Sequence, residues 1–70
     1  MPASYTAIIQ QHGDWWIGWV EEIPGVNSQG KSREELLDNL RDALEEALEM
    51  NRADARAAAS GSYEEVSLSA

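Results

Sequence analysis

The order of hydrophobic and polar residues predicts three short strands in the first half of the chain. Residues 4–11 and 15–22 are rich in aromatic and β-branched side chains, and the His-Gly-Asp sequence at 12–14 between them is typical of a turn. We therefore expect these two strands to form an antiparallel hairpin. Residues 26–29 predict a shorter third strand.

Three residues are predicted to shape the connections around the third strand. Pro24 has a restricted φ and no backbone N–H, and Gly25 beside it supplies conformational freedom. Gly30 marks the end of the strand. We interpret Pro24, Gly25 and Gly30 as structural turn residues.

A long amphipathic helix is predicted over residues 33–59. Ser32 and Glu35 match a capping box, in which the serine hydroxyl accepts the N–H of Glu35 and the glutamate carboxylate reaches back. Leucine and alanine then recur at helical spacing as one apolar stripe, which is typical of a face packed against a core. The alanine-rich stretch 51–59 favours helix by propensity.

Residues 63–68 alternate weakly between polar and apolar side chains and predict a fourth strand. The expected fold is a single α+β domain over residues 1–70, with element order β-β-β-α-β. A right-handed helical crossover would place the last strand parallel to the first. The prediction is a mainly antiparallel four-stranded sheet in the order 3-2-1-4, with the helix packed on one face.

Three tryptophans are crowded into the second predicted strand. Trp15 and Trp19 fall on one face of this strand, and Trp16 falls on the other. One helix covers one face of a sheet, so at least one tryptophan-bearing face should meet another chain. A homo-oligomer and a foreign protein both fit this expectation.

The chain is acidic, with 13 acidic and 5 basic residues and a formal net charge of −8. This field repels phosphate backbones and argues against direct binding to nucleic acid, whereas it attracts a basic protein. A solvated helix face explains the same charge without a partner, so both interpretations stay open. The candidate carboxylates are Glu21, Glu22, Asp38, Asp42, Glu45, Glu46 and Glu49.

The size of the chain also suggests association, because a domain of 70 residues has a small core and a marginal stability. The chain has no cysteine, so disulfides and thiolate metal sites are excluded. Residues 1–5 lack the pattern of a signal peptide, and no apolar run approaches the roughly 20 residues of a membrane span. We expect a soluble, cytoplasmic protein.

No catalytic, cofactor or metal site is expected from the residues present. His12 is a single histidine in a predicted turn, and neither Asp14 nor Ser28 is tied to it by a motif. Glu21 and Glu22 are adjacent along a strand and should therefore face opposite sides of it, which disfavours a shared metal. The glycines show no phosphate-binding pattern.

The stretch GDWWIGWVEEIPGVNSQG at residues 13–30 resembles the HicB-like antitoxin family, as does the helix start Ser-Arg-Glu-Glu-Leu at 32–36. The resemblance spans residues 5–68. It implies a partial ribonuclease-H-like β-β-β-α-β fold that forms dimers or tetramers. It further implies binding to a small basic HicA-type toxin that cleaves messenger RNA, whose active site the antitoxin masks.

Many members of that family append a helix-turn-helix or ribbon-helix-helix domain, and residues 1–70 offer no room for one. The expected role is therefore the neutralising module, and the alternative is an orphan self-assembling domain of the same fold without a toxin. The residues assigned to a partner or oligomer interface are Trp15, Trp16, Trp19, Glu21 and Glu22.

Overall fold

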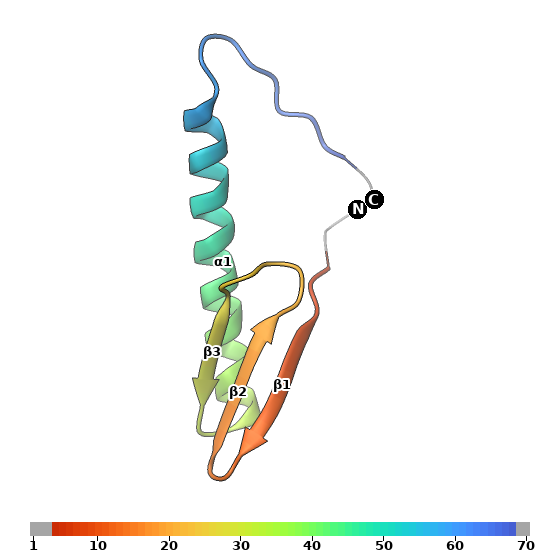
Figure 1. The fold of residues 1–70 in the computed structure, drawn as a ribbon, viewed down its shortest axis with the longest axis vertical. Helices are drawn as coiled ribbons and strands as arrows, with labels where there is room; N and C mark the ends of the chain where they lie inside the picture. Colours follow the sequence, from red (N-terminus) through yellow and green to blue (C-terminus); the bar gives the residue numbers. More distant parts are fainter. Residues whose placement is uncertain (1–3, 69–70) are drawn as a thin grey trace.

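The computed structural model describes residues 4–68 and consists of three strands followed by one long helix (Figure 1). The elements are β1 (Ala7–His12), β2 (Trp15–Val20), β3 (Asn27–Gly30) and α1 (Arg33–Ala58). The strands form one antiparallel sheet in the order β1-β2-β3. Positions 1–3 and 69–70, at the two ends of the predicted domain, lie outside the described residues.

The connections between strands lie where the sequence predicted turns. Gly13 has a φ of 61° in the two-residue turn between β1 and β2, a conformation that favours glycine. Gly25 has a φ of 90° after Pro24, and the N–H of Val26 donates to the carbonyl of Ile23 over 3.3 Å, which closes this second turn. These two turns hold the three strands antiparallel.

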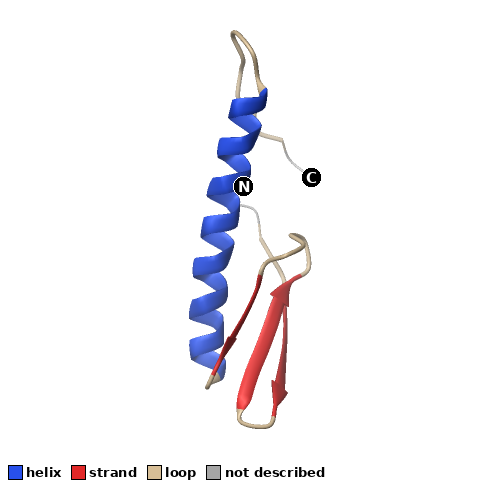
Figure 2. Cartoon of the chain, turned by 60° about the vertical axis from the view of Figure 1, so that its left-hand side comes forward, coloured by secondary structure: helices blue, strands red, loops and turns tan. Residues whose placement is uncertain are grey.

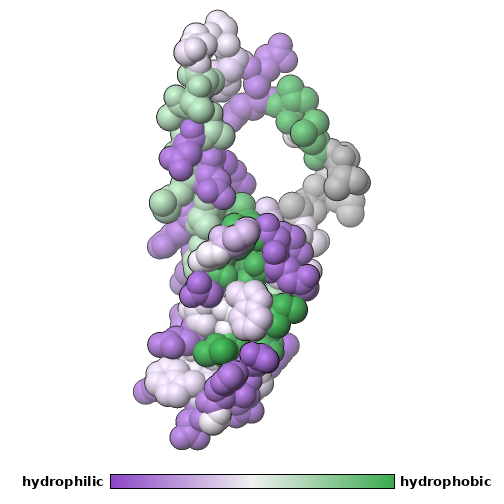
Figure 3. All heavy atoms as spheres, in the orientation of Figure 1, coloured by the Kyte–Doolittle hydropathy of each residue, from purple (hydrophilic) through white to green (hydrophobic). Residues whose placement is uncertain are grey.

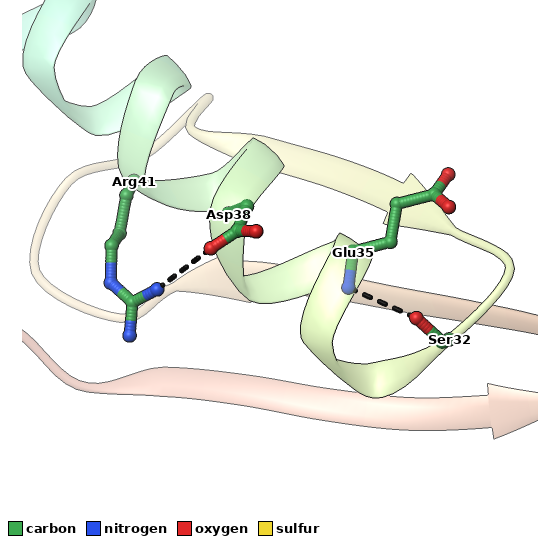
Figure 4. Close-up of polar contacts among 4 residues, drawn as sticks. All are labelled: Ser32, Glu35, Asp38 and Arg41. Atoms are coloured by element: carbon green, nitrogen blue, oxygen red, sulfur yellow. Dashed lines mark hydrogen bonds and ion pairs between the residues drawn. The ribbon is translucent and has the colours of Figure 1, made fainter.

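The start of α1 is capped by Ser32, whose extended backbone precedes the first helical residue. Its Oγ accepts a hydrogen bond from the N–H of Glu35 over 3.1 Å (Figure 4). The return bond predicted from the Glu35 carboxylate is absent within the described range 4–68. The helix continues to Ala58, one residue short of the predicted end. No helix in the described part of the chain combines the length and apolar character that a membrane span needs.

The core lies between one face of the sheet and the first half of α1 (Figure 2). Two glycines on this face let the helix approach closely. A Cβ atom at Gly18 would lie 3.1 Å from Cδ1 of Leu40, and one at Gly30 would lie 2.6 Å from the backbone nitrogen of Leu36. The buried apolar side chains are Val20, Val26, Leu36 and Leu40. Gly30 is thus required by the close approach of the helix rather than by a turn.

The predicted fourth strand at 63–68 is wrong, and with it the four-stranded order 3-2-1-4. This segment forms no strand, and its apolar side chains Tyr63, Val66 and Leu68 are all exposed. Glu65 of this segment forms an ion pair with Arg56 near the helix end, at 2.8 Å. Over the part of the chain that the structure describes, the fold is a small α+β unit with a three-stranded antiparallel sheet and one helix.

The length of α1 explains why the last segment does not reach the sheet as a strand. Its 26 residues span about 39 Å, whereas a six-residue strand spans about 20 Å. The helix therefore continues well beyond the sheet, and the chain leaves it far from β1 (Figure 1). The residues after α1 use much of their length to cover the distance from the helix end back toward the sheet.

Candidate protein-binding surface

Among residues 4–68, one face of the sheet has no cover, because α1 packs on the other face (Figure 2). We call this surface the open face. Its apolar members are Ile8, Trp15, Ile17 and Trp19, and its polar members are Gln10, His12, Asn27 and Gln29. Trp15 and Trp19 are 44% and 40% exposed, which is unusual for large aromatic side chains.

The strand register sets the neighbours on the open face. Trp19 lies in β2 between Ile8 of β1 and Asn27 of β3, so its indole has an aliphatic and an amide neighbour. Trp15 is paired with His12 at the hairpin end. None of the members of the open face is an acidic or basic residue other than His12. Figure 3 shows green and near-white side chains gathered over the sheet with purple ones around them.

The structure places the three tryptophans of the predicted interface on two different faces of the sheet. Trp15 and Trp19 lie on the open face, whereas Trp16 lies on the helix side of the sheet and is half-buried. Ile8 and Ile17 also belong to the open face and were not among the predicted interface residues. The period-two alternation along both strands was the signal that could have identified them.

Glu21 and Glu22 follow β2 directly and both are exposed. The backbone N–H of Glu21 donates to the carbonyl of Thr6 over 2.9 Å. The carboxylate of Glu22 accepts the N–H of Thr6 over 2.8 Å, and this bond lowers the pKa of Glu22 below its usual value of 4.5. Glu22 therefore ties the residue preceding β1 to the end of β2, in addition to being available at the surface.

The lowered pKa of Glu22 predicts a pH dependence of stability. A carboxyl group whose pKa is lower in the folded state stabilises the fold at neutral pH, and this contribution is lost as the pH falls through the folded pKa. In Glu22→Gln the amide oxygen still accepts the Thr6 N–H but does not titrate. We expect the unfolding free energy of the wild type to fall more steeply below about pH 4.5 than that of Glu22→Gln, as measured by urea titration.

Glu21→Gln is the matched control, because the adjacent carboxylate makes no hydrogen bond among the described residues. This variant should keep the pH dependence of the wild type. Identical acid profiles for the wild type and Glu22→Gln would contradict the assigned role of Glu22.

The predicted helix carboxylates all lie on α1 and are exposed. Two of them have ion-pair partners one turn along the helix: Asp38 with Arg41 at 3.0 Å (Figure 4) and Glu49 with Arg52 at 3.7 Å. Exposed pairs of this kind contribute little to stability. Among residues 4–68, no three histidine, aspartate or glutamate side chains are grouped as a metal site would require.

The residues weighed for catalysis are not brought together. His12 ends β1 on the open face, whereas Ser28 is paired with Gly18 on the helix side of the sheet. Asp14 lies in the hairpin turn and is exposed. The sheet itself thus separates the histidine from the serine.

Two shallow apolar grooves flank the helix. The edge groove has a volume of about 200 Å³ and lies between the start of β1 and α1; its lining includes Tyr5, Ala7, Val20, Leu37, Leu40 and Leu44. The turn groove has a volume of about 300 Å³ and lies between the Pro24-Gly25 turn and α1; its lining includes Ile23, Val26, Ala43, Ala47 and Met50. Sequence patterns did not indicate either groove, since each joins residues that are far apart in the chain.

No protein-family model matches this chain, and no curated protein or solved structure matches it significantly. What the chain binds must therefore follow from its own surface and sequence.

Proposed function

We propose that this chain is a HicB-like antitoxin module, which binds a small basic toxin that cleaves messenger RNA and masks the active site of that toxin. It acts by binding and not by catalysis, it needs no cofactor, and it works in the cytoplasm as a homo-oligomer. Neither nucleic acid nor a membrane is a direct partner. The resemblance of residues 13–30 to the HicB-like family motivates the choice of toxin class.

The open face is the observation that carries this proposal. It presents two tryptophans and an isoleucine, Trp15, Trp19 and Ile8, on a surface that the helix leaves uncovered. Contiguous exposed apolar surface marks interaction sites, and tryptophan is among the residues that contribute most to interfaces. The two indoles are the expected anchors of the partner.

The acidic charge supports a basic partner. The net charge of −8 creates an attractive field for a cationic protein and raises the rate of encounter. The open face contributes none of this charge, because its members are apolar or amide-bearing apart from His12. Attraction by the surrounding carboxylates and anchoring by the tryptophans are therefore separate contributions that salt and mutation can distinguish.

A second candidate function is self-assembly without a toxin. It is favoured by the absence of carboxylates among the members of the open face, since two copies can meet there without bringing like charges together. In that case the tryptophans serve the oligomer of an orphan domain.

Binding to the small basic protein encoded by the adjacent gene tests the first candidate. We expect a complex whose affinity falls at least about tenfold between about 50 mM and about 500 mM salt. Trp15→Ala and Trp19→Ala should each weaken it by about 2 kcal/mol or more, which corresponds to about 30-fold in Kd. Isothermal titration calorimetry measures both effects.

Tyr63→Ala is the matched control, because Tyr63 is an exposed aromatic residue that lies outside the sheet. It should bind as the wild type does. Unchanged affinity in both tryptophan variants would contradict binding through the open face, and an affinity indifferent to salt would contradict the role of the acidic field. Self-association that both tryptophan variants abolish, without any toxin binding by the wild type, would favour the second candidate.

A further inference from the structure

The outer edge of β1 carries backbone groups that no other strand of the described residues pairs. The hydrogen bond from the Glu21 N–H to the Thr6 carbonyl identifies Thr6 and Glu21 as a hydrogen-bonded pair of the β1–β2 ladder. Hydrogen-bonded and non-hydrogen-bonded pairs alternate along an antiparallel ladder, so this bond shows which residues of β1 direct their backbone groups toward β2. Backbone groups directed toward β2 belong to Ile8, Gln10 and His12. Those directed away from it, which we call the outer edge, belong to Ala7, Ile9 and Gln11.

This edge lacks the features that normally prevent strand pairing. The sequence of β1, AIIQQH, contains no proline, lysine, aspartate or glutamate. The opposite edge of the sheet is different, because β3 has four residues and the side-chain amide of Asn39 donates to the carbonyl of Gln29 over 2.9 Å. The helix thus protects one edge of the sheet and leaves the other bare.

The helix also leaves β1 uncovered along its flank. Cα atoms of α1 come within 8 Å of those of β2 and β3, whereas no Cα atom of α1 lies this close to one of β1. The edge groove runs along this flank, where Ala7 is exposed and Ile9 is half-buried. A chain that paired with the outer edge would therefore gain backbone hydrogen bonds and cover apolar side chains at the same time.

We infer that two copies of this chain pair their β1 strands antiparallel across a two-fold axis at Ile9, which joins the two sheets into one sheet of six strands. The proposed function includes a homo-oligomer, and this inference rests on that part of the proposal alone. It specifies the surface through which the copies associate and the strand register. The toxin is not involved.

The chemistry of the edge favours a second copy as the occupant. With Ile9 on the axis, Ile9 of one copy pairs with Ile9 of the other, and Ala7 of each pairs with Gln11 of the other. This register uses all of the outward N–H and C=O groups and places two β-branched side chains opposite each other. It also places no carboxylates directly opposite each other, because β1 contains none.

The joined sheet keeps the proposed binding surface free. Pairing at the outer edge extends the sheet in its own plane, so the open faces of the two copies lie side by side on one surface. Trp15 and Trp19 of each copy stay accessible to a partner. Self-association and toxin binding would thus use different surfaces of the same sheet.

Amide hydrogen exchange of the full chain, followed by NMR, tests the register directly. In the monomer the amides of Ile8, Gln10 and His12 are protected by β2, and those of Ala7, Ile9 and Gln11 exchange freely. We expect the second set to become at least tenfold more protected as the protein concentration rises from about 10 μM to about 1 mM, while light scattering shows the mass doubling from 7.7 kDa.

Gln11→Pro tests the same edge by mutation. The N–H of Gln11 points outward, so proline removes two bonds of the symmetric dimer, one from each copy, and none of the β1–β2 ladder. We expect the dimer dissociation constant to rise at least tenfold, with near-ultraviolet circular dichroism of the tryptophans unchanged. Gln11→Ala keeps the N–H and should dimerise as the wild type does.

The inference is overturned if the wild type stays a monomer at about 1 mM, or if the amides of Ala7, Ile9 and Gln11 stay unprotected. Protection that appears together in β1 and in residues 63–68 would place the C-terminal segment on the edge instead. Dimers that Trp15→Ala or Trp19→Ala abolishes, but Gln11→Pro does not, would assign self-association to the open face. All of these measurements use the purified protein without toxin, so they are independent of toxin binding.

Discussion

Gly30→Ala is expected to destabilise the domain by about 3 kcal/mol, the upper end of the usual cost of an overpacked site. A Cβ atom at this position would lie 2.6 Å from the backbone nitrogen of Leu36 and 3.1 Å from its Cα. Backbone atoms of a capped helix start do not move aside as a flexible side chain does. The methyl group would therefore force the first turn of α1 away from β3.

The expected cost is large compared with the total stability of such a domain. At roughly 0.05–0.15 kcal/mol per residue, a chain of 70 residues has about 3.5–10 kcal/mol in all. Urea unfolding followed by tryptophan fluorescence gives the free energy. Ser28→Ala is the control, since Ser28 lies on the same face of β3 and is half-buried. A Gly30→Ala protein within about 1 kcal/mol of the wild type would contradict the close packing described here.

Leu36→Ala is expected to cost roughly 3–5 kcal/mol, because the side chain is completely buried. Leu36 sits in the first turn of α1, over the β3 end where Gly30 lies. Few other side chains fill this core, as Val20, Val26 and Leu40 are the remaining buried apolar residues among those described. Little neighbouring structure is available to collapse into the cavity.

Met50→Ala on the same helix is the matched comparison, since Met50 is 66% exposed. It should change the unfolding free energy by no more than about 0.5 kcal/mol. The same urea titration reports both variants. A loss of less than about 1 kcal/mol in Leu36→Ala would show that the helix start does not form the centre of the core.

Local signals in the sequence located most of the elements to within a few residues. The capping serine, the glycines of the two turns and the alternation in the strands each act over a few neighbouring positions, and the helix starts where Ser32 predicts. The alternation also showed that Trp15 and Trp19 share a face. Such features are readable because the atoms that determine them are close together in the chain.

Residues 63–68 show where local reasoning failed. Their alternation was compatible with a strand, but a strand needs a neighbour, and the length of α1 carries the chain away from β1. Glu65 of this segment lies instead beside Arg56 near the helix end, at 2.8 Å. The alternation of polar and apolar residues within 63–68 indicates neither that the helix extends beyond the sheet nor that this ion pair forms.

The candidate interface was partly predictable for the same reason. The sequence separated Trp16 from Trp15 and Trp19 but left open which face the helix covers. In the structure α1 covers the face that carries Trp16, because it closely approaches Gly18 and Gly30, which lie on that side of the sheet. The grooves beside α1 and the bare edge of β1 likewise depend on where the helix lies.

The amino-acid sequence by itself determined the hairpin, the helix start and which residues of each strand share a face, since these depend on neighbouring residues. It also determined the acidic charge, which depends on composition alone. The tertiary structure alone decided which tryptophans stay exposed, that the sheet has three strands among the described residues, and which sheet edge is free. These features depend on how a helix longer than the sheet packs on one of its two faces, and packing joins residues that are distant in sequence.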